Sequence, residues 1–214
     1  MSIMNTVAVI GADAPPKAIQ IGGIDDSGDL QPIKVNASGQ LELAGDAITI
    51  ANVGGLMAVA SATFSRPANT DAYAAKDAVS DSTTAPTVLN FADLARENGG
   101  SGYITKARLI TNQSTNVARF RLHLYHTAPT AINDNAAFTL LWANRSNRIG
   151  YLDFDACQTE GSGSDAANAL NTTIRLAFDC AAADRDLYGL LETLDAFTPA
   201  SGQSFHIELT GDIN

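Results

Sequence analysis

Apolar and polar residues alternate along several short stretches in the second part of the chain. The alternation is clearest at residues 105–111, 120–124, 152–155, 174–180 and 205–209. Successive side chains of a β-strand point to opposite faces, so a period of two places one face on a core and the other toward solvent or a partner. Turn-forming clusters rich in Gly, Ser and Pro interrupt these stretches. The pattern predicts a succession of short β-strands.

Helical periodicity is weak along the whole sequence. Residues 134–141 could form one short helical turn, and Ser164 with Asp165 could cap another over residues 166–170. Neither segment is long enough to organise a fold. Many short strands with few helices are typical of a two-sheet sandwich or a barrel. We therefore predict an all-β protein.

The first fifty residues carry a shorter pattern of their own. The motif x-Ser-Gly-x-Leu occurs at residues 26–30 and again at 37–41, with short alternating runs around both copies. Glycine adopts positive φ at low cost, and Ser or Asp before it can bond back to the backbone, so both copies predict turns of a β-meander. The nearby Asp25, Asp26 and Asp29 lack the spacing of a calcium loop. The glycines also lack the Lys and the helix that a phosphate loop needs.

A change in element length near residues 45–56 suggests two parts. Residues 1–55 form short hairpin pieces that could bury little surface alone, and residues 56–214 carry the longer strands. The charge-free run at residues 47–65 predicts buried strands around a Gly-Gly bend. We expect a β-rich arm followed by a sandwich domain, with the arm packed on the domain or on another subunit. The apolar arm residues expected to make contacts are Ile19, Ile21, Ile33, Val35, Leu41 and Leu43.

Composition narrows the possible partners. The chain has 214 residues, 45% of them hydrophobic and 17% charged, with a net charge of −10 and 13 Lys and Arg residues. Nucleic-acid binding needs clustered basic residues, and here they are scattered, so we expect no nucleic-acid partner. The N-terminus lacks the features of a signal peptide, and no stretch resembles a membrane span. The two cysteines, Cys157 and Cys180, predict semi-buried free thiols.

Candidate catalytic and metal-binding residues are few. His123 and His126 would lie on opposite faces of a strand, where they cannot clamp one ion. The G-x-S-x-G nucleophile motif is absent. Asp153, Asp155 and Glu160 could act as an acid–base pair, but an ordinary exposed strand face explains them as well. We therefore predict no catalytic, cofactor or metal residues and no enzymatic activity.

Two features allow more than one interpretation. Lys106, Arg108, Arg119 and Arg121 could form a basic strip on one sheet face that docks onto an acidic subunit, or they could form ion pairs with neighbouring strands. The single tryptophan, Trp142, could be a platform for a sugar, but the β-rich context favours a place in the core.

Several stretches resemble a family of tailed-bacteriophage virion structural proteins. They are residues 22–43, 62–89, 98–113 and 120–141, which occur in the same order and cover well over a third of the chain. The resemblance implies a role on the virus particle, made in the host cytoplasm, as a head decoration (cement) protein. It carries no catalytic motif.

Together these observations predict a jelly-roll-like β-sandwich with an N-terminal extended β-hairpin arm. The expected partners are the major capsid protein at the outer head surface and further copies of the chain, as a homotrimer. Two alternatives stay open. One is a tail, baseplate or host-receptor-binding structural protein that uses the loops around Trp142, and the other is a glycan-acting enzyme.

Overall fold

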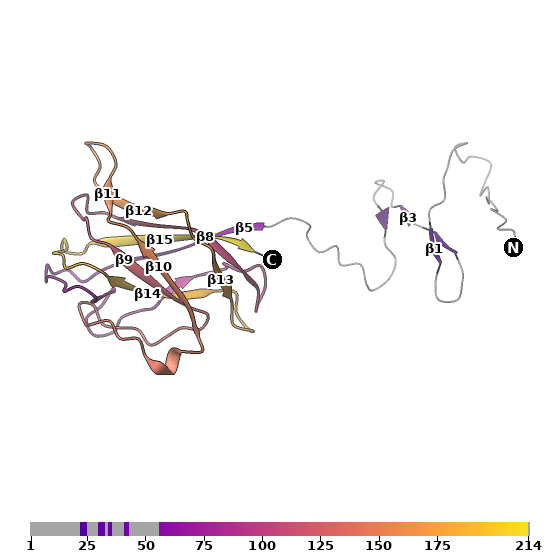
Figure 1. Cartoon of the computed structure of the whole chain (residues 1–214), viewed down its shortest axis with the longest axis horizontal. Coiled ribbons are helices and arrows are strands. Elements are labelled where there is room, and N and C mark those ends of the chain that lie inside the picture. The colour runs from indigo at the N-terminus through magenta and orange to yellow at the C-terminus, as the bar shows by residue number, and fades with distance from the viewer. Residues whose placement is uncertain (1–21, 25–29, 33, 36–40, 43–55, 214) are drawn as a thin grey trace. The chain divides into compact units, whose positions relative to one another are not determined.

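The computed structural model describes residues 22–24, 30–32, 34–35, 41–42 and 56–213 (Figure 1). The chain divides into two units, Met1–Val53 and Gly54–Asn214. In the first unit β1 (Gly22–Ile24) pairs with β2 (Leu30–Pro32), and β3 (Lys34–Val35) pairs with β4 (Leu41–Glu42), both antiparallel. The segments between the paired strands contain the two Ser-Gly motifs and lie outside the described residues.

The second unit consists of two antiparallel sheets. The sheet built around β8, here the β8 sheet, has the order β11 (Gln158–Thr159), β12 (Ala167–Asn171), β8 (Ser101–Thr111), β15 (Ser204–Ile213) and β5 (Leu56–Ser65), and β13 (Leu176–Asp179) also pairs with β8. The β9 sheet has the order β10 (Arg148–Phe154), β9 (Phe120–Tyr125), β14 (Leu187–Thr193) and β6 (Ala78–Val79), and β7 (Leu89–Phe91) also pairs with β14. A single 3-10 turn, η1 (Trp142–Asn144), accompanies the strands in the described part of the chain.

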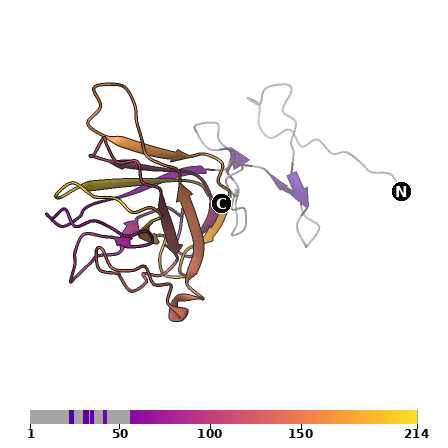
Figure 2. The same cartoon turned by 60° about the vertical axis from the view of Figure 1, so that its left-hand side comes forward.

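The core lies between the two sheets. Phe120 of β9 meets Phe205 of β15 edge to face, with ring centroids 5.5 Å apart, and Phe64 of β5 stacks on Phe205 at 5.4 Å. Such rings bury large apolar areas and prefer these offset and edge-on geometries. Ile207 and Leu209 follow Phe205 on the buried face of β15. The prediction of an all-β protein with two packed sheets is confirmed, and Figures 1 and 2 show the sheets from two directions.

Strands lie at the stretches where apolar and polar residues alternate, as predicted, but other elements differ from the prediction. The sequence allowed a short helical turn at residues 166–170, yet residues 167–171 form β12, because pairing with β8 satisfies their backbone groups. The helical turn that the sequence also allowed at residues 134–141 does not form. There Phe138 donates its backbone N–H to Lys76, and Asp134 donates to Ser82, so the backbone bonds to other loops. The sequence did not predict strand β14, because both of its faces are buried and its residues therefore do not alternate between apolar and polar.

A buried polar network joins loops far apart in the sequence. The Arg66 and Asp134 side chains are fully buried and form an ion pair at 3.2 Å. Arg66 also donates to the Tyr73 hydroxyl at 2.9 Å, and that hydroxyl donates to Asp134. Burial and the neighbouring carboxylate raise the pKa of Tyr73, so it stays a neutral donor. The network ties the chain after β5 to the long loop at residues 126–147.

Removing one partner from this network should be costly. Asp134→Ala leaves the Arg66 charge buried without its counterion, and we expect the free energy of unfolding to fall by roughly 3–5 kcal/mol. Urea denaturation monitored by circular dichroism measures this change.

The matched control is Asp153→Ala, which breaks the exposed ion pair between Arg121 and Asp153. Solvent screens that pair, so its loss should cost less than about 1 kcal/mol. Equal losses in the two variants would contradict a structural role for the buried network.

Candidate interaction surfaces

The four basic residues proposed as one strip lie on different sheets. Lys106 and Arg108 belong to β8, whereas Arg121 belongs to β9 and Arg119 directly precedes it. The interpretation of these four residues as a single basic surface is therefore wrong. The period-two pattern placed each pair on a strand face, but strand order, which decides which faces coincide, depends on long-range pairing.

Each of these basic residues has an acidic neighbour. Glu208 of β15 lies 3.6 Å from Lys106 and 3.1 Å from Arg108. Across the other sheet, Arg121 and Asp153 are directly opposite and 2.6 Å apart. Arg119 pairs with Asp195 at 2.7 Å, which lowers the pKa of Asp195 to about 2. The ion-pair interpretation is confirmed for these four side chains, with Lys106 and Arg108 sharing the single carboxylate of Glu208.

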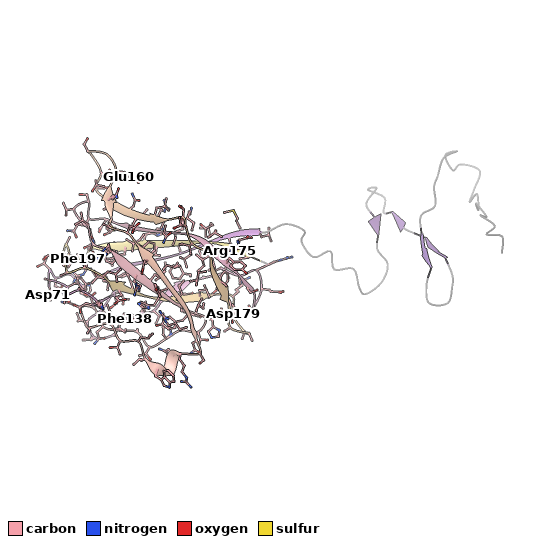
Figure 3. The ribbon with its side chains drawn as sticks, viewed as in Figure 1. Asp71, Phe138, Glu160, Arg175, Asp179 and Phe197 are labelled. Carbon is pink, nitrogen blue, oxygen red and sulfur yellow. The ribbon has the colours of Figure 1, made fainter. Side chains whose placement is uncertain are left out.

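Two of the three acidic residues considered for acid–base chemistry, Asp153 and Glu160, are held by neighbouring side chains. Arg121 binds both oxygens of Asp153, at 2.6 and 2.9 Å. Glu160 accepts a bond from the Asn168 amide at 2.9 Å, and it lies where the loop leaves β11 (Figure 3). Asp155 is exposed just beyond the end of β10. Within the described ranges, no group of three or more His, Cys, Asp or Glu residues could hold a metal ion.

A buried pair formed by His123 and Glu192 lies on the outer side of the β9 sheet. His123 Nε2 is 2.8 Å from Glu192 Oε2, and Arg148 Nη2 is 3.3 Å from His123 Nδ1. An arginine can only donate, so Nδ1 accepts and the neutral ring donates from Nε2 to Glu192. Phe138 stacks on the imidazole at 4.1 Å. His126 lies just beyond the end of β9, and its Nε2 is 3.2 Å from the Ser146 carbonyl oxygen.

Burial governs the protonation of His123. Desolvation lowers the pKa of His123 from its ordinary value of 6.5, Arg148 and Arg121 lower it further, and Glu192 opposes them. The sequence showed His123 on a strand but gave no sign of Glu192, which lies 69 residues away in the chain. The pair is closed to solvent, and it ties β9 to β14.

The lowered pKa predicts a pH dependence of stability. As pH falls below about 6.5, the unfolded chain takes up a proton on His123 before the folded chain does, so the free energy of unfolding should decrease with decreasing pH. Denaturation at a series of pH values between about 7.5 and 5.5 measures the slope.

Replacing the imidazole should flatten this slope. His123→Gln removes the titrating group, whereas His206→Gln is a surface change of the same type that leaves His123 in place. A slope unchanged by His123→Gln would show that other groups cause the pH dependence.

An apolar edge strand is exposed on the β8 sheet. Strand β5 pairs with β15 along its full length of 10 residues and has no strand on its other side within the described residues. Met57 is 74% exposed and Val59 is 61% exposed, and Leu56 is also exposed. The strand contains neither a charged residue nor a proline. Proteins usually protect such edges with charges, prolines or bulges, because an open apolar edge pairs with other chains.

Trp142 is on the surface, so its predicted place in the core is wrong. The side chain is 80% exposed, and the neighbouring Leu140 and Leu141 are exposed as well. Phe138, not Trp142, supplies the aromatic ring that packs on the β9 sheet. The Arg145 guanidinium lies over the indole, 4.8 Å from its centroid. Figure 1 shows η1, which carries Trp142, projecting from the lower side of the second unit.

The remaining predicted residues divide between described and undescribed parts. Val35 of β3 and Leu41 of β4 are cross-strand partners. The other expected arm contacts lie outside the described residues: Ile19, Ile21, Ile33 and Leu43. Cys157 and Cys180 are free and buried, as expected, and burial raises the pKa of their thiols to about 12 and about 11.

A scan against models of known protein families finds no match, and a search of curated proteins finds no relative of this chain. The helices of the described residues include none of the length and apolar character that crossing a bilayer requires.

Proposed function

We propose that this chain is a structural protein of a tailed-bacteriophage virion that decorates the outer surface of the head. In this role residues 1–55 are an arm and residues 56–214 are a rigid domain, and the protein stabilises joints between capsid subunits as a homotrimer. The observation that carries the proposal is the exposed, uncharged edge of β5, which directly follows the proposed arm.

We further propose that the domain is a jelly roll. In support, one sheet contains β5, β15, β8 and β12 in that order. The other sheet contains β6, β14, β9 and β10 in that order, and β7 also pairs with β14. The chain passes repeatedly from one sheet to the other, and its final strand lies between β5 and β8. Double-sheet jelly rolls of eight strands are found in viral capsid and lectin domains.

The edge of β5 offers the geometry for strand addition. An extended segment that pairs with an open edge gains backbone hydrogen bonds, and side chains on alternate positions fix its register. Met57 and Val59 lie on the same outward face of β5, so the side chains on that face of an added strand would lie beside both. The partner we propose is an extended segment of the major capsid protein.

Electrostatics fits a position on the outside of a particle. The net charge of −10 disfavours contact with a packaged genome and keeps the free protein soluble. The cross-strand pairs Arg108–Glu208 and Arg121–Asp153 neutralise one basic residue on each sheet. Apolar burial and backbone pairing therefore supply the proposed attachment, and its dependence on salt concentration should be weak.

Placing a charge on the β5 edge should weaken attachment. Val59→Lys introduces a charge that must be desolvated when a strand adds, so we expect at least about a tenfold loss of affinity for purified heads, the equivalent of about 1.4 kcal/mol. Val117→Lys is the matched control, because Val117 is 71% exposed in a loop away from this edge. Binding to heads that lack the protein, measured by co-sedimentation, tests both variants. Equal binding by both would remove the β5 edge from the proposal.

The role of the arm requires a separate experiment. Deleting residues 1–50 should leave the second unit folded and reduce its occupancy on heads, measured by gel densitometry of purified particles. Full occupancy by the truncated protein would show that the arm does not clamp the capsid.

The exposure of Trp142 favours a second candidate, a tail, baseplate or host-receptor-binding protein whose η1 loop faces the receptor. Labelling virions with an antibody and imaging them separates head from tail. A glycan-acting enzyme is the last alternative, and release of sugar from host polysaccharide by the purified chain would establish it.

A further inference from the structure

His126 holds the base of the long loop at residues 126–147. It directly follows β9, and its backbone N–H donates to the Asn147 carbonyl at 2.9 Å. Its side chain reaches the same end of the loop, because Nε2 lies 3.2 Å from the Ser146 carbonyl oxygen. A carbonyl oxygen can only accept, so Nε2 carries a proton and donates it to this bond. His126 therefore joins the two ends of the loop through both its backbone and its ring.

The other ring nitrogen of His126 is buried and has no hydrogen-bond partner among the described residues. A neutral ring has one N–H, which Nε2 uses, so Nδ1 is a bare acceptor. It lies 3.6 Å from Oδ2 of Asp179, the last residue of β13, which Figure 3 labels. A carboxylate is an acceptor as well, so the two atoms face each other without a hydrogen between them. Leaving a buried polar atom in this state costs free energy.

A single proton on Nδ1 removes this mismatch. The imidazolium donates from Nδ1 to Asp179 and keeps its bond from Nε2 to Ser146, so both nitrogens have partners. The charge also strengthens both contacts, because hydrogen bonds from a charged donor are shorter and stronger than those from a neutral one. Strand β13, which ends at Asp179, belongs to the β8 sheet, whereas His126 follows a strand of the β9 sheet. Protonation therefore links the base of the loop to the opposite sheet.

We propose that His126 and Asp179 form a proton-operated latch that fastens the base of this loop in mildly acidic solution. Histidine is the side chain whose ordinary titration falls between about pH 5 and 8. The latch acts on the part of the loop between Phe138, which is stacked on the β9 sheet, and Ser146. That part carries η1 and the exposed Trp142. The inference goes beyond the proposed function and does not depend on a capsid.

The nearby His123 is surrounded by different groups. Its ring faces Glu192 of β14, Arg148 of β10 and Arg121 of its own strand. Desolvation lowers the pKa of His123, and the two arginines lower it further, so this ring stays neutral at a pH where an ordinary histidine is charged. Its bonds to Glu192 and Arg148 are therefore kept while the latch closes.

Nuclear magnetic resonance of the ring nitrogens tests the proton site directly. At about pH 8 we expect His126 to carry its proton on Nε2 and to leave Nδ1 bare, and at about pH 5.5 both nitrogens should be protonated. A neutral ring with its proton on Nδ1 would overturn the inference, because Nδ1 would then donate to Asp179 at every pH.

Hydrogen exchange measures the closing of the latch. The backbone amide of His126 closes the loop base, so its protection factor should be about two- to fivefold higher at about pH 5.5 than at about pH 8. Asp179→Ala should abolish this rise, and it should fold normally because the Asp179 side chain is 72% exposed. Asp165→Ala is the matched control, since it removes an exposed carboxylate between β11 and β12 and should leave the rise intact.

Trp142, the single tryptophan of the chain, reports on the loop itself. Its fluorescence anisotropy should rise on acidification in the wild-type protein and in Asp165→Ala, and it should stay constant in Asp179→Ala. Equal rises in the two variants would overturn the latch, and so would an unchanged protection factor or anisotropy in the wild-type protein. These results leave capsid decoration standing, because binding to purified heads tests that function separately.

Discussion

Strand β15 is the element on which the domain depends, because it is hydrogen-bonded on both sides. It pairs with β5 on one side and with β8 on the other, and so joins the first long strand of the second unit to the middle of the β8 sheet. Its inward side chains, among them Phe205 and Ile207, fill the space between the sheets. Because β15 occupies one side of β5 only, the other side of that strand becomes an edge of the sheet.

Polar groups buried around this core fix the loops. Arg66, Tyr73 and Asp134 form a closed set in which each charge and hydroxyl has a partner. A buried polar network that is fully satisfied rigidifies its surroundings, whereas one that loses a member is costly. Here it holds the loop that carries Trp142, so the exposure of that residue is a property of an ordered surface. His123 and Glu192 act in a similar way beneath the same loop.

The surface of the second unit combines neutralised charge with local apolar exposure. Cross-strand ion pairs such as Arg108 with Glu208 use basic and acidic residues against each other. Strand β5 and residues 140–142, by contrast, expose large apolar side chains. Only 17% of the residues are charged, and these two exposed apolar surfaces are candidates for association. Strand β5 belongs to the β8 sheet, whereas Trp142 lies in the loop between β9 and β10, so one protein could use both surfaces together.

The sequence by itself determined the fold class and many of the strands. Alternation at residues 205–209 reflects a local rule, since neighbouring side chains of a strand face opposite ways, and this stretch became a strand with one face buried. Residues 120–124 also became a strand, but there His123 on the second face is buried as well. It also indicated free thiols at Cys157 and Cys180, whereas it left ion pairing as one of two interpretations for Arg121.

Only the tertiary structure decided features that depend on residues far apart in the chain. Strand β14 is covered on both faces and shows no alternation, and β12 is a strand because β8 lies beside it. Glu192, the partner of His123, is 69 residues away in the chain. The loop is anchored by Arg66 through Asp134, and this anchoring decides that Phe138, and not Trp142, covers the sheet. Periodicity cannot specify these contacts, because it describes the faces of an element and not the element that packs against them.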